Sequence, residues 1–317
     1  MGESAMQSKG IRTIQEGLRG LVTDMFPDIF PGMFEDGDES TDPAIGSEDT
    51  GKGYAYGSVK GDAFRTGAGE QTDVALDDID QGVLGDCYFM AALGALAKAK
   101  PDWIKGLIKE NKDAKNPSTV VSYTVTFYNY WGNEVTETVT PTFPVDKGGN
   151  PVYAQPTLEE TVGATYELWP MIMEKAYAQW YEGYDEIESG YVDTALEHLT
   201  GKDASLHYRG FVYTWYGVPE PEPVLDWFTR MNTDFKANKA VCITTYDGVG
   251  KKGNLVTGTN GVAVSGSHVY VVDSINLNGA ASTVTLYNPH GHDHPVLNLT
   301  QFETCVKRYG CLDEELQ

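Results

Sequence analysis

The chain has 317 residues, of which 41% are hydrophobic, and its 46 acidic and 23 basic residues give a formal net charge of −23. This length and hydrophobic content predict a globular protein of one large or two small domains. The negative charge argues against a nucleic-acid partner and against an anionic membrane surface. It leaves room for divalent cations, for a basic peptide substrate, or simply for solubility.

The absence of targeting signals and the spacing of the cysteines indicate the cellular compartment of the protein. No apolar run approaches membrane-spanning length, and no apolar segment follows the first basic residues. The four cysteines show neither disulfide nor zinc spacing, so we expect reduced thiols. These features predict a cytoplasmic protein with no membrane partner, and an injected or secreted effector is left open.

The first 74 residues are expected to stand apart from the rest. Residues 11–26 place apolar side chains at helical spacing and predict one amphipathic helix. From about 32 to 74 the composition shifts to Gly, Asp, Glu, Ser and Thr, which predicts a flexible acidic linker. Whether residues 1–74 inhibit, target or merely link is left open.

The remaining chain is expected to fold as an α+β protein. Residues 78–116 show a helical pattern, residues 121–145 predict a β-hairpin, and helices return around 158–199. Strands dominate from about residue 208, apart from one helix expected at 223–239. The predicted domains are therefore an N-terminal region at 1–74, a helical subdomain at 75–205 and a strand-rich subdomain at 206–317.

One cysteine lies where a catalytic thiol is expected. Cys87 begins the apolar run CYFMAALGALA, which predicts a buried helix. The N-terminus of a helix favours the thiolate, which is the nucleophilic form of cysteine. Gln81 lies six residues earlier, so its amide would donate, with the Cys87 N–H, to a developing oxyanion. The alternative is an inert cysteine buried in a core helix.

A base and an orienting group follow much later in the chain. His268 stands at the start of a predicted strand, and Asn288 follows a second one. The turn signal Asn278-Gly279 between them predicts a hairpin, which would place the Asn288 amide beside the imidazole. The alternatives are a histidine satisfied at a strand end and a turn residue before Pro289.

These residues resemble the active site of calpain-type cysteine proteases. The string QGVLGDCY, from Gln81, matches the signature that opens the catalytic helix of that family, and residues 167–201 are similar to its helical subdomain. Asn288 begins an Asn-Pro-His-Gly sequence where calpains carry Asn-Pro-Trp-Gly. The resemblance covers roughly residues 70–317. It implies a papain-like fold, with the cysteine in a helical half and the histidine and asparagine in a strand-rich half.

The resemblance implies a cysteine endopeptidase that acts on proteins or peptides. Self-cleavage is also expected within residues 32–74, because that segment is predicted to be flexible and exposed. Cys87 would attack the scissile carbonyl and form an acyl-enzyme, and His268 would carry the proton. Asn288 would orient the imidazole and Gln81 would stabilise the oxyanion. Two alternatives stay open: a transglutaminase-like acyl transferase with the same triad, and a catalytically silent calpain-like binding module.

Calcium is the cofactor that the resemblance suggests, although the chemistry does not require it. Asp78 and Asp185 match positions that supply calcium-ligating carboxylates in calpains, and carbonyls near Gln71 and Asp73 would complete the site. The alternative is two ordinary surface acids. The acidic loop of the second calpain calcium site is shortened here, and His290 replaces a tryptophan that wedges into the calpain cleft without calcium. We therefore expect weak calcium dependence.

The sequence HGHDH contains three further histidines close to Asn288. His290, His292, Asp293 and His294 would suit zinc, copper or nickel. No distant fourth ligand is evident, and a solvated turn at the rim of the cleft is the favoured interpretation.

Overall fold

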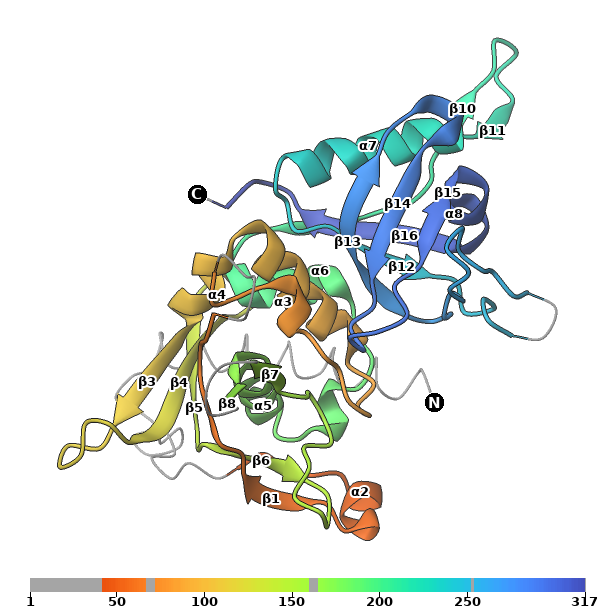
Figure 1. Cartoon of the computed structure of the whole chain (residues 1–317). Coiled ribbons are helices and arrows are strands. Elements are labelled where there is room, and N and C mark those ends of the chain that lie inside the picture. The colour runs from red at the N-terminus through yellow and green to blue at the C-terminus, as the bar shows by residue number, and fades with distance from the viewer. Residues whose placement is uncertain (1–41, 67–71, 160–164, 252–253, 317) are drawn as a thin grey trace, which may run out of the picture. The chain divides into compact units, whose positions relative to one another are not determined.

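The computed structural model describes residues 42–66, 72–159, 165–251 and 254–316 (Figure 1). Residues 42–317 form one compact unit. The helix predicted at 11–26 lies outside the described residues. In the described part, no helix is both long enough and apolar enough to cross a membrane.

The main helices in the first part of this unit are α3 (Cys87–Ala99), α4 (Pro101–Leu107), α5 (Trp169–Trp180) and α6 (Val192–Thr200). Helix α3 is central, and every residue from Tyr88 to Ala97 is buried. Its small Ala and Gly residues allow close contact with α4, α6 and a strand of the main sheet. Pro101 begins α4, where its missing N–H costs nothing, so the chain turns directly from α3 into α4.

The same part also contains sheets, so it is less purely helical than expected. Strands β3 (Ile108–Lys112), β4 (Val120–Tyr128) and β5 (Glu134–Val139) form an antiparallel sheet. The predicted hairpin is confirmed, with Gly132 in the left-handed region at φ 72°. Residues 108–112 were expected to be helical, but they pair with β4 and bury Ile108. Tertiary pairing thus overrides the local pattern.

Residues 42–66 are folded, which corrects part of the predicted linker. Helix α2 (Ser47–Lys52) is followed by β1 (Ala55–Ser58), paired with β6 (Thr142–Val145). Strand β2 (Gly61–Asp62) pairs with β8 (Thr165–Glu167), which pairs with β7 (Thr157–Glu159). Asp42 accepts from the fully buried Lys175 ammonium at 2.5 Å. The acidic composition of this segment predicted that its carboxylates would be solvated. Asp42 instead pairs with Lys175, which is far away in the sequence.

The second part is a six-stranded antiparallel sheet in the order β15-β14-β13-β12-β16-β9, and it confirms the predicted excess of strands. The strands are β9 (Ala204–His207), β12 (Cys242–Thr245), β13 (Val269–Asn276), β14 (Thr283–Tyr287), β15 (Val296–Asn298) and β16 (Val306–Leu312). Helices α7 (Val224–Lys236), predicted from the sequence, and α8 (Leu299–Cys305) accompany it.

The sheet is buried on both faces, which explains its continuous apolar runs. Cys242, Val269 and Val271 join the core around α3. The alternate residues Ile243, Tyr270 and Val272 join a second core with α7 and α8. In Figure 1 the blue strands accordingly lie beside the orange helix α3. This packing brings the start of β13 close to the start of α3.

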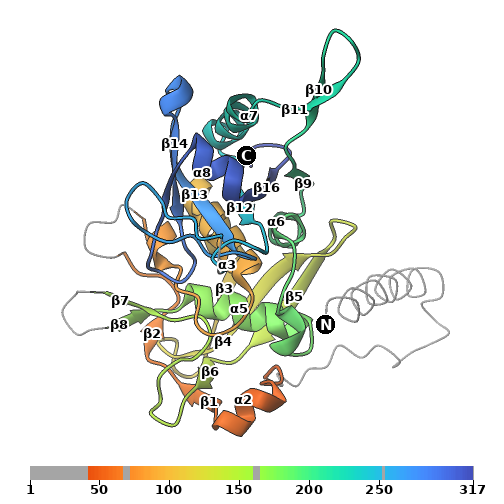
Figure 2. The same ribbon diagram turned by 90° about the vertical axis from the view of Figure 1, so that its right-hand side faces the viewer.

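A two-stranded hairpin, β10 (Phe211–Tyr213) and β11 (Pro219–Pro221), connects β9 to α7. Both views show it projecting from the rest of the unit (Figures 1 and 2). Its turn carries Trp215 and Tyr216, which are 97% and 89% exposed. None of its strand residues is buried, so the hairpin adds nothing to either core.

Candidate active site

The Cys87 thiol lies at the N-terminus of α3, with Asp86 as the N-cap residue. Part of the residue stays accessible, but desolvation by the surrounding protein raises the pKa of the thiol to about 11. The N–H groups of Val269, Tyr88 and Cys87 lower that pKa, and the Asp86 carboxylate raises it further. Desolvation outweighs the favourable helix terminus, so the thiol keeps its proton in this state.

His268 and Asn288 are brought together by the β13–β14 hairpin. The imidazole Nε2 lies 2.8 Å from the Asn288 Oδ1, and both residues are buried. The His268 backbone is anchored on Thr245, whose Oγ1 accepts from the His268 N–H at 3.1 Å and whose N–H donates to the His268 carbonyl at 3.0 Å. The ring is therefore held by strand pairing rather than by a mobile loop.

The hydrogen bonds also define which imidazole nitrogen carries the proton. The Asn288 Oδ1 accepts from the His290 backbone N–H at 3.3 Å, which identifies it as the amide oxygen. The His268 Nε2 must then donate to it, and the Nδ1 is left as an acceptor. Burial lowers the pKa of His268 to about 4, against the opposing effect of the Asn288 bond. The ring is thus neutral at pH 7, and its unprotonated Nδ1 is an acceptor, although burial disfavours the charged imidazolium.

Gln81 lies in the loop that leads into α3, and its side-chain amide already makes a hydrogen bond within that loop. The Nε2 donates to the Leu84 carbonyl at 2.5 Å. The Gln81 side chain also lies near the Asp86 carboxyl and lowers the pKa of that group. The amide is thus fixed within the loop, at a buried position close to the N-terminus of α3.

Three hydrogen bonds join this loop to the loop around Asn288. The Gln81 N–H donates to the Pro289 carbonyl at 2.6 Å, and the Gln81 carbonyl accepts from the His290 Nδ1 at 2.9 Å. The Tyr287 hydroxyl donates to the Ile79 carbonyl at 2.8 Å. Together with the Val269 N–H, which hydrogen-bonds to the thiol, they hold the two parts of the site in contact.

The histidine tract after Asn288 is divided among different partners. The His290 ring lies parallel to the His268 ring, with centroids 5.4 Å apart. His292 contacts Asp293 at 2.9 Å, and the His294 Nδ1 accepts from the Asn288 N–H at 3.0 Å. Within the described ranges, HGHDH forms no group of three closely spaced ligand atoms. The structure therefore lends no support to a metal site in this tract.

Two buried carboxyl groups lie beneath Cys87, and the motif analysis did not single them out. Asp86 and Glu174 of α5 are both buried, and the Asp86 carboxyl raises the pKa of Glu174. Desolvation raises the pKa of Asp86 to about 7, and it raises the pKa of Glu174 as well. Both Glu174 oxygens accept from the Ala154 N–H, at 3.0 and 3.1 Å. The available signal was a glutamate within the apolar run WPMIMEKAYA.

A second pair of carboxyl groups contains Asp78, one of the two acids expected to bind calcium. Its partner is Glu167, which is also buried and hydrogen-bonds to it. The Asp78 Oδ2 accepts from the Ala75 N–H at 2.6 Å and from the Trp169 Nε1 at 2.9 Å. Desolvation raises the pKa of Asp78 to about 6. Two adjacent buried carboxyl groups supply oxygen ligands of the kind that a hard divalent cation prefers.

The other residues expected at the calcium site lie elsewhere. Asp185 is exposed at the start of a short 3₁₀ helix (Asp185–Ile187), where its carboxylate lies against Gly46. The Asp73 carboxylate pairs with the Lys105 ammonium at 2.8 Å. Gln71 lies outside the described residues. The structure therefore groups Asp78 with Glu167, a residue that the sequence analysis did not select.

Comparisons with known proteins agree on one family. The family described as calpain family cysteine protease matches residues 69–294. The chain is 32% identical over 126 residues to calpain-14 of Homo sapiens, which covers 39% of this chain and 17% of that protein. It is 34% identical over 127 residues to calpain-13 of Rattus norvegicus, with the same shares. A calpain-type cysteine protease of Zea mays is 34% identical over 124 residues, 39% of this chain and 5% of the relative. The matches thus span less than a fifth of these relatives.

Proposed function

This chain belongs to the calpain family of cysteine proteases, and from that premise we propose that Cys87, His268 and Asn288 form the catalytic triad of an endopeptidase. The observation that carries the proposal is the 2.8 Å contact between the His268 Nε2 and the Asn288 Oδ1. His268 directly precedes Val269, whose N–H hydrogen-bonds to the Cys87 thiol. The family supports protein or peptide substrates.

The proposed reaction begins with transfer of the Cys87 proton to the His268 Nδ1. The sulfur attacks the scissile carbonyl, and the imidazolium returns the proton to the departing amine, which leaves an acyl-enzyme. Water then attacks the thioester carbonyl while His268 takes a proton from that water. The carbon–sulfur bond breaks, the carboxylic acid product leaves, and the imidazolium returns the proton to the Cys87 sulfur. The Asn288 Oδ1 stabilises the imidazolium because it accepts from the protonated Nε2 throughout.

The oxyanion formed in each step would lie at the N-terminus of α3. The Cys87 backbone N–H supplies one donor and the Gln81 amide the other. The Gln81 side chain is fixed by the Leu84 carbonyl, so its position does not have to be organised during the reaction. Desolvation of this region strengthens both donors, because opposing charges are less screened there.

We propose a papain-like arrangement in which the site lies between two subdomains. The two hydrophobic cores support this division, one around α3 and one between the sheet and α7. The subdomains would be residues 75–205 and 206–317. Residues 42–66 would join the first, since their strands pair with strands of that part.

Calcium would act away from the reacting atoms. Asp78 and Glu167 fit the ion better than Asp78 and Asp185, because only the first two carboxyl groups lie together. A bound calcium ion would balance the negative charge of these two carboxylates. Asp78 ends the short 3₁₀ helix Leu76–Asp78, three residues before Gln81, so its carboxyl anchors the loop that carries the oxyanion donor.

The test is incubation of the full chain with casein, with calcium or with chelator, followed by mass spectrometry of all fragments. We expect cleavage by the wild type and none by Cys87→Ala, whose fold is checked by its thermal unfolding curve. Cys305→Ala is the matched control, because that thiol is also buried but belongs to the second core. Normal cleavage by a folded Cys87→Ala protein would refute the proposal.

The same experiment separates the two alternatives. An added amine acceptor would be incorporated into the products if the chain were a transglutaminase-like acyl transferase. A catalytically silent binding module would leave casein intact and would fail to react with an epoxide or vinyl-sulfone probe at Cys87. Labelling of Cys87 together with peptide release is the result that the endopeptidase proposal requires.

A further inference from the structure

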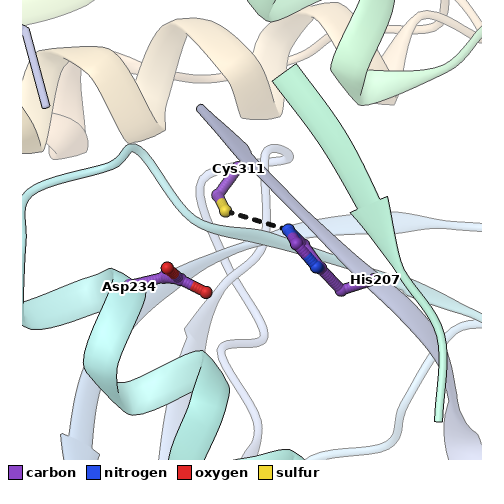
Figure 3. A group of neighbouring side chains, drawn as sticks. All are labelled: His207, Asp234 and Cys311. Atoms are coloured by element: carbon purple, nitrogen blue, oxygen red, sulfur yellow. Dashed lines mark hydrogen bonds between the residues drawn. The ribbon is translucent and has the colours of Figure 1, made fainter. Parts of the chain in front are cut away.

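A cluster of metal-ligating side chains lies outside the active site, at the edge of the six-stranded sheet. It consists of His207 at the end of β9, Asp234 on α7 and Cys311 on β16 (Figure 3). One ligand atom from each residue lies within 4.8 Å of the other two. No other trio or larger set of His, Cys, Asp or Glu in the described part of the chain meets this spacing.

The fold brings the three together from distant parts of the sequence. Strands β9 and β16 are antiparallel neighbours, with His207 opposite Tyr309. Cys311 is two residues further along β16, so it shares a face of the sheet with His207. Helix α7 packs on that face through the second core and brings Asp234 to the same place.

The spacing fits a tetrahedral metal ion. The Cys311 Sγ lies 3.6 Å from the His207 Nε2. Ordinary zinc–sulfur and zinc–nitrogen bonds at the tetrahedral angle place these two atoms about 3.5 Å apart. The imidazole and the thiol therefore need almost no rearrangement to share one ion.

The surrounding residues already orient two of the ligands. The His207 ring stacks on the Tyr309 ring, with centroids 4.5 Å apart and planes inclined by 19°. The Tyr309 hydroxyl donates to the Asp234 Oδ2 at 2.9 Å. One tyrosine thus fixes both the imidazole and the carboxylate, as outer-shell partners do around metal sites.

Protonation and access also suit a metal ion. Burial lowers the pKa of His207, which favours the neutral form of the ring. Burial raises the pKa of the Cys311 thiol to about 12, so an ion would have to displace its proton. Cys311 is buried, but His207 and Asp234 are partly exposed, which leaves an access route for the ion.

Lys239 would compete with a metal ion for the Asp234 carboxylate. Its Nζ lies 3.0 Å from the Asp234 Oδ1 and forms an ion pair with that carboxylate. A carboxylate oxygen has a second lone pair, and the lysine side chain is long and partly exposed, so it can move towards solvent. Positive charge beside the site nevertheless opposes binding of a cation.

We propose that His207, Asp234 and Cys311 bind one borderline-soft divalent cation of the zinc class, with water as its fourth ligand. Nitrogen, oxygen and sulfur donors together suit zinc or cobalt and do not suit calcium or magnesium. Such an ion would connect α7 to the outer strands of the sheet and would have a structural role independent of peptide cleavage.

The experiment titrates Co²⁺ into the full-length Cys87→Ala protein, which removes the active-site thiol as a competing ligand. We expect one equivalent to produce a thiolate-to-cobalt charge-transfer band and Zn²⁺ to bleach it, while excess Ca²⁺ leaves it unchanged. Adding Cys311→Ala should abolish the band. His207→Gln and Asp234→Asn should weaken cobalt binding at least about tenfold, which is the cost of disturbing even an outer-shell partner.

Two controls make the result decisive. Cys305→Ala removes another buried thiol, whose pKa burial also raises to about 12, and it should leave the band intact. Lys239→Met removes the competing charge and should tighten binding several-fold. A folded protein that shows no band, or a band that survives Cys311→Ala or is lost in Cys305→Ala, would overturn the proposal. Thermal unfolding of each variant identifies any that fail to fold, and the three separate ligand variants keep the test valid in that case.

Discussion

At the residue scale, the hydrogen bond between His268 and Asn288 is the contact on which the proposed catalysis depends most. Asn288→Ala should leave partial activity, since the nucleophile and base remain. Loss of one hydrogen bond of about 1–1.5 kcal/mol predicts a fall in kcat/KM of about tenfold. The measurement is peptide cleavage, with circular dichroism to confirm the fold. If the variant unfolds instead, Asn288 is a structural residue of the turn.

His290 contributes two of the contacts that join the loops of the candidate site. Its imidazole donates to the Gln81 carbonyl at 2.9 Å and lies parallel to the His268 ring. These contacts need no cation, so we expect the wild type to cleave peptides in chelator and calcium to raise the rate only modestly. In His290→Trp the bulky ring cannot make the same bond within that space and prefers to fill the cleft. Activity in chelator should therefore fall.

The measurement for His290 is cleavage rate against free calcium, for wild type and His290→Trp. Asp293→Asn, in the same loop but exposed, is the matched control. A wild type that is inactive in chelator and activated by calcium would contradict this interpretation of His290. No calcium response in either protein would mean that the Asp78 and Glu167 pair does not make activity dependent on calcium.

At the element scale, two buried carboxyl groups that resist ionisation lie where α3 and α5 meet. Asp86 and Glu174 have raised pKa values in the folded protein. Folding therefore retains protons that the unfolded chain releases above about pH 4. Stability contributed by these protons is present at low pH and is lost as the pH rises towards about 7.

Glu174→Gln should reduce this loss, because the amide at position 174 cannot ionise. We expect the variant to be more stable than wild type at pH 8, by roughly 1 kcal/mol or more, and nearly equal to it at pH 5. Urea unfolding at both pH values measures the difference. Glu220→Gln on the exposed hairpin is the control. Parallel pH dependence in wild type and Glu174→Gln would show that the pair does not destabilise the fold.

Elements with strong local signals were predictable from the sequence, and elements fixed by distant partners were not. The hairpin that joins His268 to Asn288 has a turn signal between two apolar runs, and α7 has a helical pattern. Residues 108–112 carry no strand signal of their own, and only β4 makes them a strand. Likewise, Asp42 is held by Lys175, a contact that no local window contains.

The candidate site divides in the same way. Cys87, His268 and Asn288 were selected because nucleophile, base and orienting group have recognisable neighbours in the sequence. Glu167 was missed because its carboxyl partner, Asp78, lies far away in the sequence. His207, Asp234 and Cys311 have no motif at all, since three separate elements bring them together. Residues that only tertiary packing brings together have no regular spacing in the sequence, so no motif identifies them.

At the scale of the whole molecule, the proposed protease is attached to its own potential substrate. We expect wild-type protein to cut itself in trans within the acidic region around residues 32–74. Residues 42–66 pair with strands of the catalytic unit, and folded strands resist cleavage. New N-termini should therefore concentrate outside 42–66. Time-resolved mass spectrometry of wild type and Cys87→Ala is the measurement, and identical cuts in both would indicate a contaminating protease.

The exposed hairpin offers a practical opportunity for protein engineering. Its base is fixed by Arg209, whose guanidinium donates to the Glu222 carbonyl at 2.6 Å and pairs with the Glu303 carboxylate. The Gly210 N–H donates to the Glu222 carboxylate at 3.1 Å. Because these anchors lie below the turn, residues 211–218 can be exchanged for an epitope or a fluorophore tag without disturbing either core. The chain thus offers an internal segment for surface display.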